Sequence, residues 1–498
     1  MIGTSVWDYV FIRTCIFFLH LVAPLSVLYL VTSLFIPLPF GIPRVLEVWI
    51  ALEAAFYLVV YLPRKAYLQR ATTHPVPPCR EDRRKLFRRC HSTIPDLDRY
   101  LTKWFQDAPA AEIKRENIKD FFRWAFLNTG ELDSGHEEEL DEYVGELEKM
   151  LGRELEPGRG NAKCLRLTLD EVDMLHRSLT WYLCVFIVDT VASGYLRYYS
   201  FDFHRTPLAR SHSVFPLRPF NLFTTHLSPA KTLTYWHRPH TSKTRIPILF
   251  IHGIGIGLYP YVNFLSELNA QISEDSPDGQ VGIIAVEIMS VSFRITSESM
   301  LKGEMCEEID SILKAHGWDK FVLVSHSYGS IIATHLLHTS HIAEKIGPIL
   351  FIDPVSFLLH LPDVAYNFMC RKPTRANEHQ LSYFASKDMG VSHTLSRRFF
   401  WADNIMWKED LKNHHVTVSL AGRDLIVDAK VIAAYLIGEE NWTPEAGGSD
   451  YGVWKGDTLG VLWFQQLDHA QVFDKKRTRA KLVSVVQKYC ARDYKTGT

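Results

Sequence analysis

Two long apolar stretches open the sequence. Cys15 to Ile36 is a run of 22 residues without a charged side chain, long enough for a helix to cross the hydrocarbon core of a bilayer. Val45 to Leu62 is a second apolar run, which contains Glu47 and Glu53. The proline-rich break between the two runs predicts a turn. We therefore expect residues 1–70 to form a membrane hairpin, although two buried helices of a soluble bundle would show a similar pattern.

Positive charge follows the second apolar run. Residues 64–89 contain nine Lys or Arg side chains and only two acidic ones. A basic flank beside a membrane segment is typical of the cytoplasmic side, and it can contact anionic lipid headgroups. We expect a membrane protein whose main body faces the cytosol. A solvated basic loop that binds nothing is the alternative for the flank itself.

The pattern of residues 71–205 is helical. From Asp96 to Leu155, apolar positions recur at the spacing of solvated amphipathic helices. Thr168 and Glu171 have the spacing of a capping box ahead of a long apolar helix. Asp189 interrupts that helix, so we expect it to pack between the membrane and the main body of the protein rather than to span the bilayer.

Short β-forming runs alternate with helical segments in residues 206–498. This alternation predicts a mostly parallel sheet with helices on both faces. The expected strands are Leu233–Trp236, Ile246–Ile251, Val281–Val286, Phe321–Val324, Ile349–Ile352, Val416–Leu420 and Val461–Gln465. The segment 354–413 separates two of these strands and is rich in aromatic and apolar residues, so we expect it to form a cap over the sheet.

Composition narrows the possible functions. The formal net charge is −1, so nothing in the overall charge favours a nucleic acid as partner. The eight cysteines include no close pairs, which argues against both a zinc knuckle and a disulfide framework. We expect neither a cofactor nor a bound metal.

A candidate nucleophile follows the predicted strand Phe321–Val324. The chain continues as Ser325-His-Ser327-Tyr-Gly329 and then as an apolar helical run. A serine between small residues, placed between a strand and a helix, is the pattern of a nucleophile elbow, whose sharp turn lifts the serine hydroxyl clear of the sheet. Gly329 is as small as this turn requires, whereas Ser325 stands where the commonest pattern has glycine. Ser327 is the predicted nucleophile.

A glycine-rich loop follows the predicted strand Ile246–Ile251. It reads His252-Gly253-Ile254-Gly255, with a further glycine at 257. Glycines after a strand can cradle the pyrophosphate of a dinucleotide, but the spacing of these glycines does not fit that motif. A flexible His-Gly loop in this position fits an oxyanion hole, for which the backbone amides of Ile254 and Tyr328 are the expected donors.

A serine nucleophile needs a base, and the base needs a carboxylate that orients it. Asp424 comes just after the predicted strand Val416–Leu420, and His469 follows the last predicted strand. This order along the chain predicts a catalytic triad of Ser327, Asp424 and His469. Asp353, at the end of another strand, and Asp428, which would cap a helix, are the rival acids.

These motifs together resemble the α/β-hydrolase superfamily over residues 235–495. The resemblance is carried by His252-Gly253-Ile254-Gly255, Ser325-His-Ser327-Tyr-Gly329, Gly422-Arg-Asp424 and Asp468-His469. More narrowly, Ile352-Asp353-Pro354-Val355 and the run 357–368 resemble membrane-anchored hydrolases of fungi. The resemblance implies an α/β-hydrolase fold and a serine-hydrolase mechanism, and it also makes Asp353 a position that can carry the acid.

We therefore expect an N-terminal membrane hairpin (1–70), a helical, partly membrane-proximal region (71–205) and an α/β-hydrolase domain (206–498) with a cap insertion (354–413). The expected activity is hydrolysis of carboxylic esters, either lipid esters or others with a hydrophobic acyl group. The expected partners are that ester and membrane lipids, which the hairpin and the basic flank 64–89 would contact. The alternatives are an acyltransferase that uses the same triad and a non-catalytic, hydrolase-like membrane scaffold.

Overall fold

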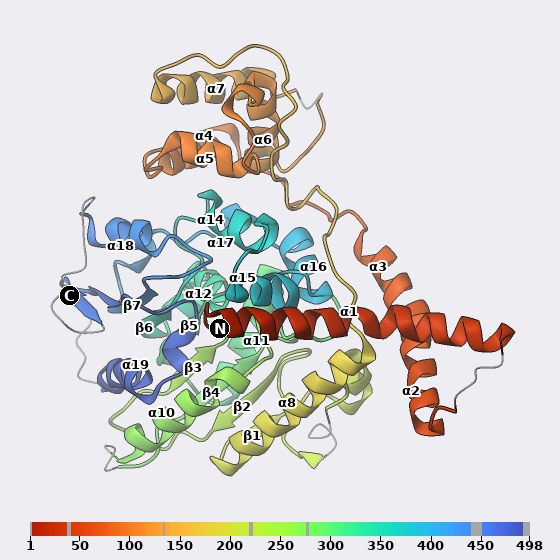
Figure 1. Cartoon of the computed structure of the whole chain (residues 1–498). Coiled ribbons are helices and arrows are strands. Elements are labelled where there is room, and N and C mark those ends of the chain that lie inside the picture. Colours follow the sequence, from red (N-terminus) through yellow and green to blue (C-terminus); the bar gives the residue numbers. More distant parts are fainter. Residues whose placement is uncertain are drawn as a thin grey trace.

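A large twisted sheet organises the C-terminal part of the chain (Figure 1). The computed structural model describes residues 2–36, 41–132, 135–218, 223–274, 278–439 and 451–491, so residues 37–40 of the predicted turn lie outside it. Within these ranges the sheet has nine strands in the order β1-β2-β4-β3-β5-β6-β7-β9-β8. The strands are β1 Asp202–His204, β2 Thr234–Arg238, β3 Ile248–Ile251, β4 Ile283–Glu287, β5 Phe321–His326, β6 Ile346–Ile352, β7 Val416–Ala421, β8 Gly452–Lys455 and β9 Leu459–Phe464.

The central strands are parallel, and antiparallel strands stand at both edges. β4, β3, β5, β6, β7 and β9 run parallel to one another, whereas the pairs β1–β2, β2–β4 and β8–β9 are antiparallel. Side chains along a strand alternate between the two apolar layers: Leu249 and Ile251 of β3 face one layer, and Ile248 and Phe250 face the other. The predicted α/β fold with helices on both faces is confirmed.

Helices cover both faces of the sheet. The layer that contains Ile248 also holds α10 (Val262–Glu274), α19 (Lys476–Tyr489) and one face of α8 (Leu179–Tyr198). The layer that contains Leu249 holds α11 (Lys302–Ala315), α12 (Gly329–Leu337) and α18 (Ala429–Ile437). Both layers bury continuous apolar strand surface, which is why the strands consist of unbroken apolar runs.

A helical layer packs on the segment between β6 and β7. Its helices are α4 Arg80–His91, α5 Leu97–Trp104, α6 Arg115–Leu127 and α7 Glu137–Leu151. The helices below it are α14 Pro362–Ala365, α15 Ala376–Gln380, α16 Met389–Arg397 and α17 Trp401–Asn404 (Figure 1). Phe126 of α6 contacts Trp401 of α17, and Trp104 of α5 donates a hydrogen bond to the carbonyl of His360. The helical layer therefore shares one apolar core with the segment that it covers.

Three helices of the described chain are long and apolar enough to cross a membrane, judged by length and composition: α1 (Val6–Phe35), the continuous helix Arg44–Leu68 and α8. The second of these is made of α2 (Arg44–Ala55), a π-helical stretch and α3 (Leu62–Leu68). One face of α8 packs on the sheet, while Leu183, Ile187 and Val191 on its other face are exposed. These exposed apolar faces are compatible with membrane association.

The start of α8 is capped by residues other than those that the sequence predicts. Glu53 is fully buried, and its carboxylate accepts hydrogen bonds from the amides of Leu179 and Thr180 at the start of α8. The predicted capping box at Thr168 is wrong, because α8 begins at Leu179 and its cap is Ser178. The Thr168 hydroxyl instead accepts a hydrogen bond from the indole of Trp124.

Most of the basic flank forms ion pairs inside the protein. Four arginines pair with acidic side chains of α7: Arg80 and Arg84 with Glu142, Arg83 with Glu139, and Arg88 with Glu146. Lys85 pairs with Glu81 and Asp82 of its own helix, and Arg89 pairs with Glu409. Lys65 and Arg70 form no ion pair with any described residue. They stand at the end of the helix Arg44–Leu68, so the positive charge left for a lipid headgroup lies close to that candidate membrane helix.

Candidate active site

The turn after β5 has the backbone conformation of a nucleophile elbow. Ser327 has a φ of +50°, in the left-handed region that a non-glycine residue seldom adopts. A Cβ on Gly329 would lie 2.4 Å from the carbonyl oxygen of Ile251, so only glycine fits there. Ser325 stands where the commonest elbow pattern has glycine. Its side chain is buried in β5, and its hydroxyl has no hydrogen-bond partner among the described residues.

The structure brings Ser327, His469 and Asp424 together from three different loops. The Ser327 hydroxyl lies 2.8 Å from Nε2 of His469, to which it can donate a hydrogen bond. Nδ1 of the same imidazole lies 2.7 Å from Oδ2 of Asp424 and can donate to it. The other oxygen of Asp424 accepts the amides of Ile426 and Val427, which fixes the carboxylate in place.

The two rival acids make different contacts. Asp353 is buried beside Asp424 and His469, but its oxygens accept the amides of Ala421 and Ala470 rather than the imidazole. Asp428 caps α18 by accepting the amide of Val431. Among the three carboxylates, the geometry favours Asp424 as the partner of His469.

Burial and charge shift the acidities in this group. Burial has the largest single effect and lowers the pKa of His469, but the charge and hydrogen bond of Asp424, with smaller contributions from Asp353 and Asp468, together outweigh it and raise the pKa to about 9. Burial also raises the pKa of Asp353 to about 7, in spite of the opposing effect of His469. The imidazolium form of His469 is therefore stabilised, which suits a group that must receive a proton from serine.

The loop after β3 approaches the serine closely. A Cβ on Gly253 would lie 2.7 Å from the Cβ of Ser327, so glycine is required there too. Nε2 of His252 accepts the amide of Ile288, and its Nδ1 donates to the carbonyl of Gly253. Burial lowers the pKa of His252, which keeps the imidazole in the neutral form that these two bonds require. His252 thus supports the conformation of the loop.

The backbone amides around Ser327 differ in whether they have an acceptor. Two of them are engaged: the amide of Gly253 donates to the hydroxyl of Tyr261, and that of Gly255 donates to the carbonyl of Val291. Within the described chain, the amides of Ile254 and Tyr328 have no acceptor. Both residues line the cavity that contains Ser327, as a pair of oxyanion donors would.

The cavity beside Ser327 is narrow and apolar, with a volume of about 50 Å³. Part of its wall comes from the segment 354–413, including Leu359, Phe368 and Phe399. The remainder of the wall includes Trp104 of α5 and Trp124 of α6. The sequence predicts amphipathic helices at these positions but no contact with the site. No local motif marks these tryptophans, because they reach the site through packing between distant segments.

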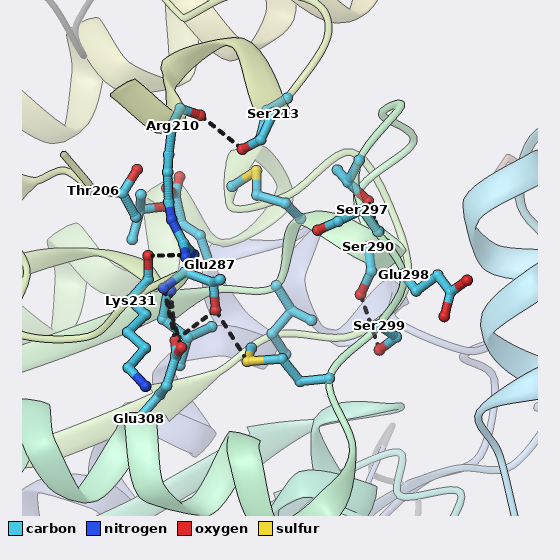
Figure 2. Close-up of a pocket in the computed structure, with 18 of the residues that line it drawn as sticks. Thr206, Arg210, Ser213, Lys231, Glu287, Ser290, Ser297, Glu298, Ser299 and Glu308 are labelled. Atoms are coloured by element: carbon cyan, nitrogen blue, oxygen red, sulfur yellow. Dashed lines mark hydrogen bonds between the residues drawn. The ribbon is translucent and has the colours of Figure 1, made fainter. Parts of the chain in front are cut away.

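A larger pocket of about 1080 Å³ opens elsewhere, between the segment 206–234 and the connection from β4 to α11 (Figure 2). Polar and charged side chains line it, among them Arg210, Lys231, Glu298 and Glu308. Ser327, Asp424 and His469 are not among its lining residues. We therefore take the smaller cavity, which contains Ser327, as the candidate site of the reaction.

Neither the protein-family models nor the curated proteins gave a match to this sequence. Among solved structures, a membrane phospholipase A described as a bacterial virulence factor is similar over 62% of this chain and 94% of its own length, at 11% identity and a TM-score of 0.38. A carboxylesterase of Bacillus subtilis is similar over 62% of this chain and 97% of its own, at 10% identity and a TM-score of 0.36. The strand order and the strained serine turn after β5 identify the architecture of this chain as the α/β-hydrolase fold.

Proposed function

We propose that this protein is a membrane-associated serine hydrolase that cleaves carboxylic esters with a hydrophobic acyl group. The observation that carries the proposal is the position of His469, whose two ring nitrogens lie within hydrogen-bond distance of the Ser327 hydroxyl and the Asp424 carboxylate. The unpaired amides of Ile254 and Tyr328 support it, because they face the same cavity. A residue is then present for each catalytic role: nucleophile, base, orienting acid and oxyanion donors.

The proposed reaction proceeds through an acyl-enzyme. Ser327 Oγ attacks the ester carbonyl while its proton passes to Nε2 of His469, and the amides of Ile254 and Tyr328 stabilise the oxyanion. The carbon–oxygen bond to the alcohol breaks as His469 returns the proton to the leaving oxygen. A water then attacks the acyl-enzyme by the same route, which releases the carboxylic acid and restores Ser327. Asp424 holds His469 in the required tautomer throughout.

The cavity sets the size of the acyl group. The volume of the cavity is only about 50 Å³. The lining is almost wholly hydrocarbon, including Trp104, Trp124 and Phe399. These dimensions favour a short apolar acyl chain. A long lipid acyl chain would require the segment 354–413 to move.

The position of α1 supports a location at a membrane. Its N-terminal half packs on the segment 354–413, where Ile12 and Ile16 contact Ala376 and Tyr383. Its remaining large apolar side chains are mostly exposed, as are those of the helix Arg44–Leu68. A lipid phase would remove this apolar surface from water and bring the cavity close to the hydrophobic esters dissolved there.

Hydrolysis of short-chain p-nitrophenyl esters by the full-length protein in detergent micelles tests the proposal. Ser327→Ala should lose at least about three orders of magnitude in kcat. The matched control is Ser325→Ala, two residues away, whose buried hydroxyl has no partner among the described residues. Equal activity of the folded Ser327→Ala variant and the wild type would rule out the proposed mechanism, and product analysis with added alcohols would reveal acyl transfer.

A further inference from the structure

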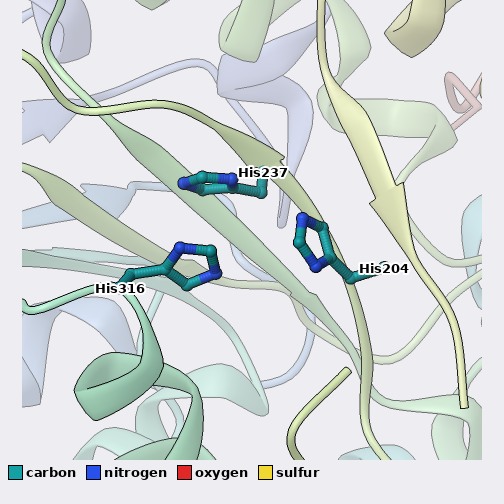
Figure 3. A group of neighbouring side chains, drawn as sticks. All are labelled: His204, His237 and His316. Atoms are coloured by element: carbon teal, nitrogen blue, oxygen red, sulfur yellow. The ribbon is translucent and has the colours of Figure 1, made fainter. Parts of the chain in front are cut away.

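A cluster of imidazoles lies at the β1–β2 edge of the sheet, away from the serine site (Figure 3). Its members are His204 at the end of β1, His237 in β2 and His316 just after α11. From each residue one ring nitrogen can be chosen so that all three lie within 4.8 Å of one another. Figure 3 shows the three rings arranged around a shared space.

The strand register explains why these side chains converge. His204 pairs with Tyr235 across the antiparallel ladder, and Asp202 pairs with His237. Cross-strand partners, and residues two apart along a strand, lie on the same face of a sheet. His204, Tyr235 and His237 therefore share one face, and the C-terminal end of α11 brings His316 to the same place.

The cluster has the donor chemistry of a metal site. His204 and His237 are both about nine-tenths buried. A neutral imidazole offers one ring nitrogen with a lone pair to a metal ion.

Tyr235 orients two of the rings. Its hydroxyl lies 3.0 Å from Nδ1 of His204 and 2.8 Å from Nε2 of His316. These two nitrogens consequently converge on the Tyr235 hydroxyl, and the centroid of the His237 ring lies 3.9 Å from that of His316, with the two rings tilted by 33°. Asp202 lies on the same face and supplies a nearby negative charge that would offset part of the charge of a bound cation.

We propose that His204, His237 and His316 bind one divalent transition-metal ion of the class that prefers imidazole, with zinc as the first candidate. Three histidines with the remaining position open to water or to the Tyr235 hydroxyl form a known type of zinc coordination. The nitrogens lie within 4.8 Å of one another, so the side chains would have to rotate to bring them to bonding distance of one ion. The ion would join β1, β2 and the end of α11, and this role is independent of the serine chemistry. The proposal revises the expectation of no metal, which rested only on closely spaced ligands.

Titration of the metal-free, full-length protein with Co²⁺ and Zn²⁺ tests the proposal. We expect one Co²⁺ per chain with visible absorption typical of nitrogen ligation, its displacement by Zn²⁺, and a rise of several degrees in Tm with excess Zn²⁺. His237→Phe, which keeps an aromatic ring beside that of His316, and His316→Phe should each weaken the binding of Co²⁺ and Zn²⁺ at least tenfold. His341→Ala, which changes an exposed histidine, should bind like the wild type.

Two results would overturn the proposal. One is the absence of stoichiometric Co²⁺ or Zn²⁺ binding to the wild type, and the other is unchanged affinity in both phenylalanine variants. The wild-type measurement stands even if one variant fails to fold. Labelling of Ser327 by a fluorophosphonate, with and without Zn²⁺, should be the same, so failure of the metal site and failure of the serine mechanism are distinguishable.

Discussion

The carboxylate of Asp424 lies 2.7 Å from Nδ1 of His469, and this contact determines the expected pH dependence. Only the neutral imidazole can accept the proton of Ser327. Because Asp424, with smaller contributions from Asp353 and Asp468, raises the pKa of His469 to about 9 against the effect of burial, the active form becomes more abundant as the pH rises. We predict that kcat/KM for a short-chain ester increases with pH and has its midpoint well above 6.5. A midpoint at or below 6.5 would contradict the structure.

Replacement of Asp424 should shift that midpoint. Asp424→Asn removes the charge that raises the pKa of His469 and leaves burial, which lowers it. The ascending limb should move to lower pH, and kcat should fall by about 10³–10⁴-fold because the tautomer of His469 is no longer fixed. The measurement is the pH profile of the variant beside that of the wild type.

The comparison of Asp353→Asn with Asp424→Asn separates the two acids. Asp353 accepts the amides of Ala421 and Ala470, so an asparagine there would turn its NH₂ group toward one of these donors. We predict lower thermal stability with substantial labelling of the folded fraction by a fluorophosphonate. If Asp353→Asn abolished labelling and Asp424→Asn did not, Asp353 would be the acid.

The size of the cavity predicts selectivity for chain length. Leu395 of α16 lines the cavity, whereas Val391 of the same helix is buried elsewhere. Wild-type protein should hydrolyse p-nitrophenyl acetate and butyrate better than the palmitate. Leu395→Ala should improve the ratio of kcat/KM for longer chains severalfold, and Val391→Ala should leave the ratio unchanged. A wild-type preference for palmitate would show that the site opens beyond the described cavity.

The reactivity of two cysteines tests whether the exposed apolar side of α8 lies in the membrane. Cys79 and Cys184 are both exposed, but Cys184 lies on α8 beside Leu183 and Ile187, among exposed apolar side chains. In variants that keep only one of these cysteines, a water-soluble maleimide applied to opened membranes should label Cys79 readily. Cys184 should react only after detergent is added. Rapid labelling of Cys184 in intact bilayers would place α8 in water.

A buried charge network ties α8 to the sheet. Asp189 accepts hydrogen bonds from Arg218 and Arg294, and Arg218 also pairs with Glu287 at the end of β4. Asp189→Asn leaves two buried guanidinium groups short of a counter-charge, which should cost about 3–5 kcal/mol of stability. Asp98→Asn, which removes an exposed ion pair with Arg153, should cost at most about 1 kcal/mol. Thermal unfolding in micelles compares the two variants.

The sequence predicts the parallel core better than the edges and the walls of the cavity. The central strands appear as unbroken apolar runs because both of their faces are buried, so each was expected close to its observed position. β1 has three residues and β8 alternates exposed residues with half-buried ones, so neither shows that pattern. The residues Ser327, Asp424 and His469 follow strand ends, where local spacing is informative.

Features that depend on distant packing could not be predicted. Trp104 and Trp124 reach the cavity only because the helical layer folds over the segment 354–413. The cap of α8 combines Ser178 with Glu53, which is remote in the chain, and Thr168 accepts a hydrogen bond from the indole of Trp124, which is also remote. The imidazole cluster likewise depends on strand register rather than on spacing along the chain.

Covalent trapping tests directly whether Ser327 is a nucleophile activated by His469. The full-length protein would be treated with a fluorophosphonate, and the adduct would be measured by intact mass and located by peptide mapping. We predict one adduct per chain on Ser327, normal labelling of Ser325→Ala, and no labelling of folded Ser327→Ala or His469→Ala. An adduct on another residue, or none in well-folded wild-type protein, would contradict the account.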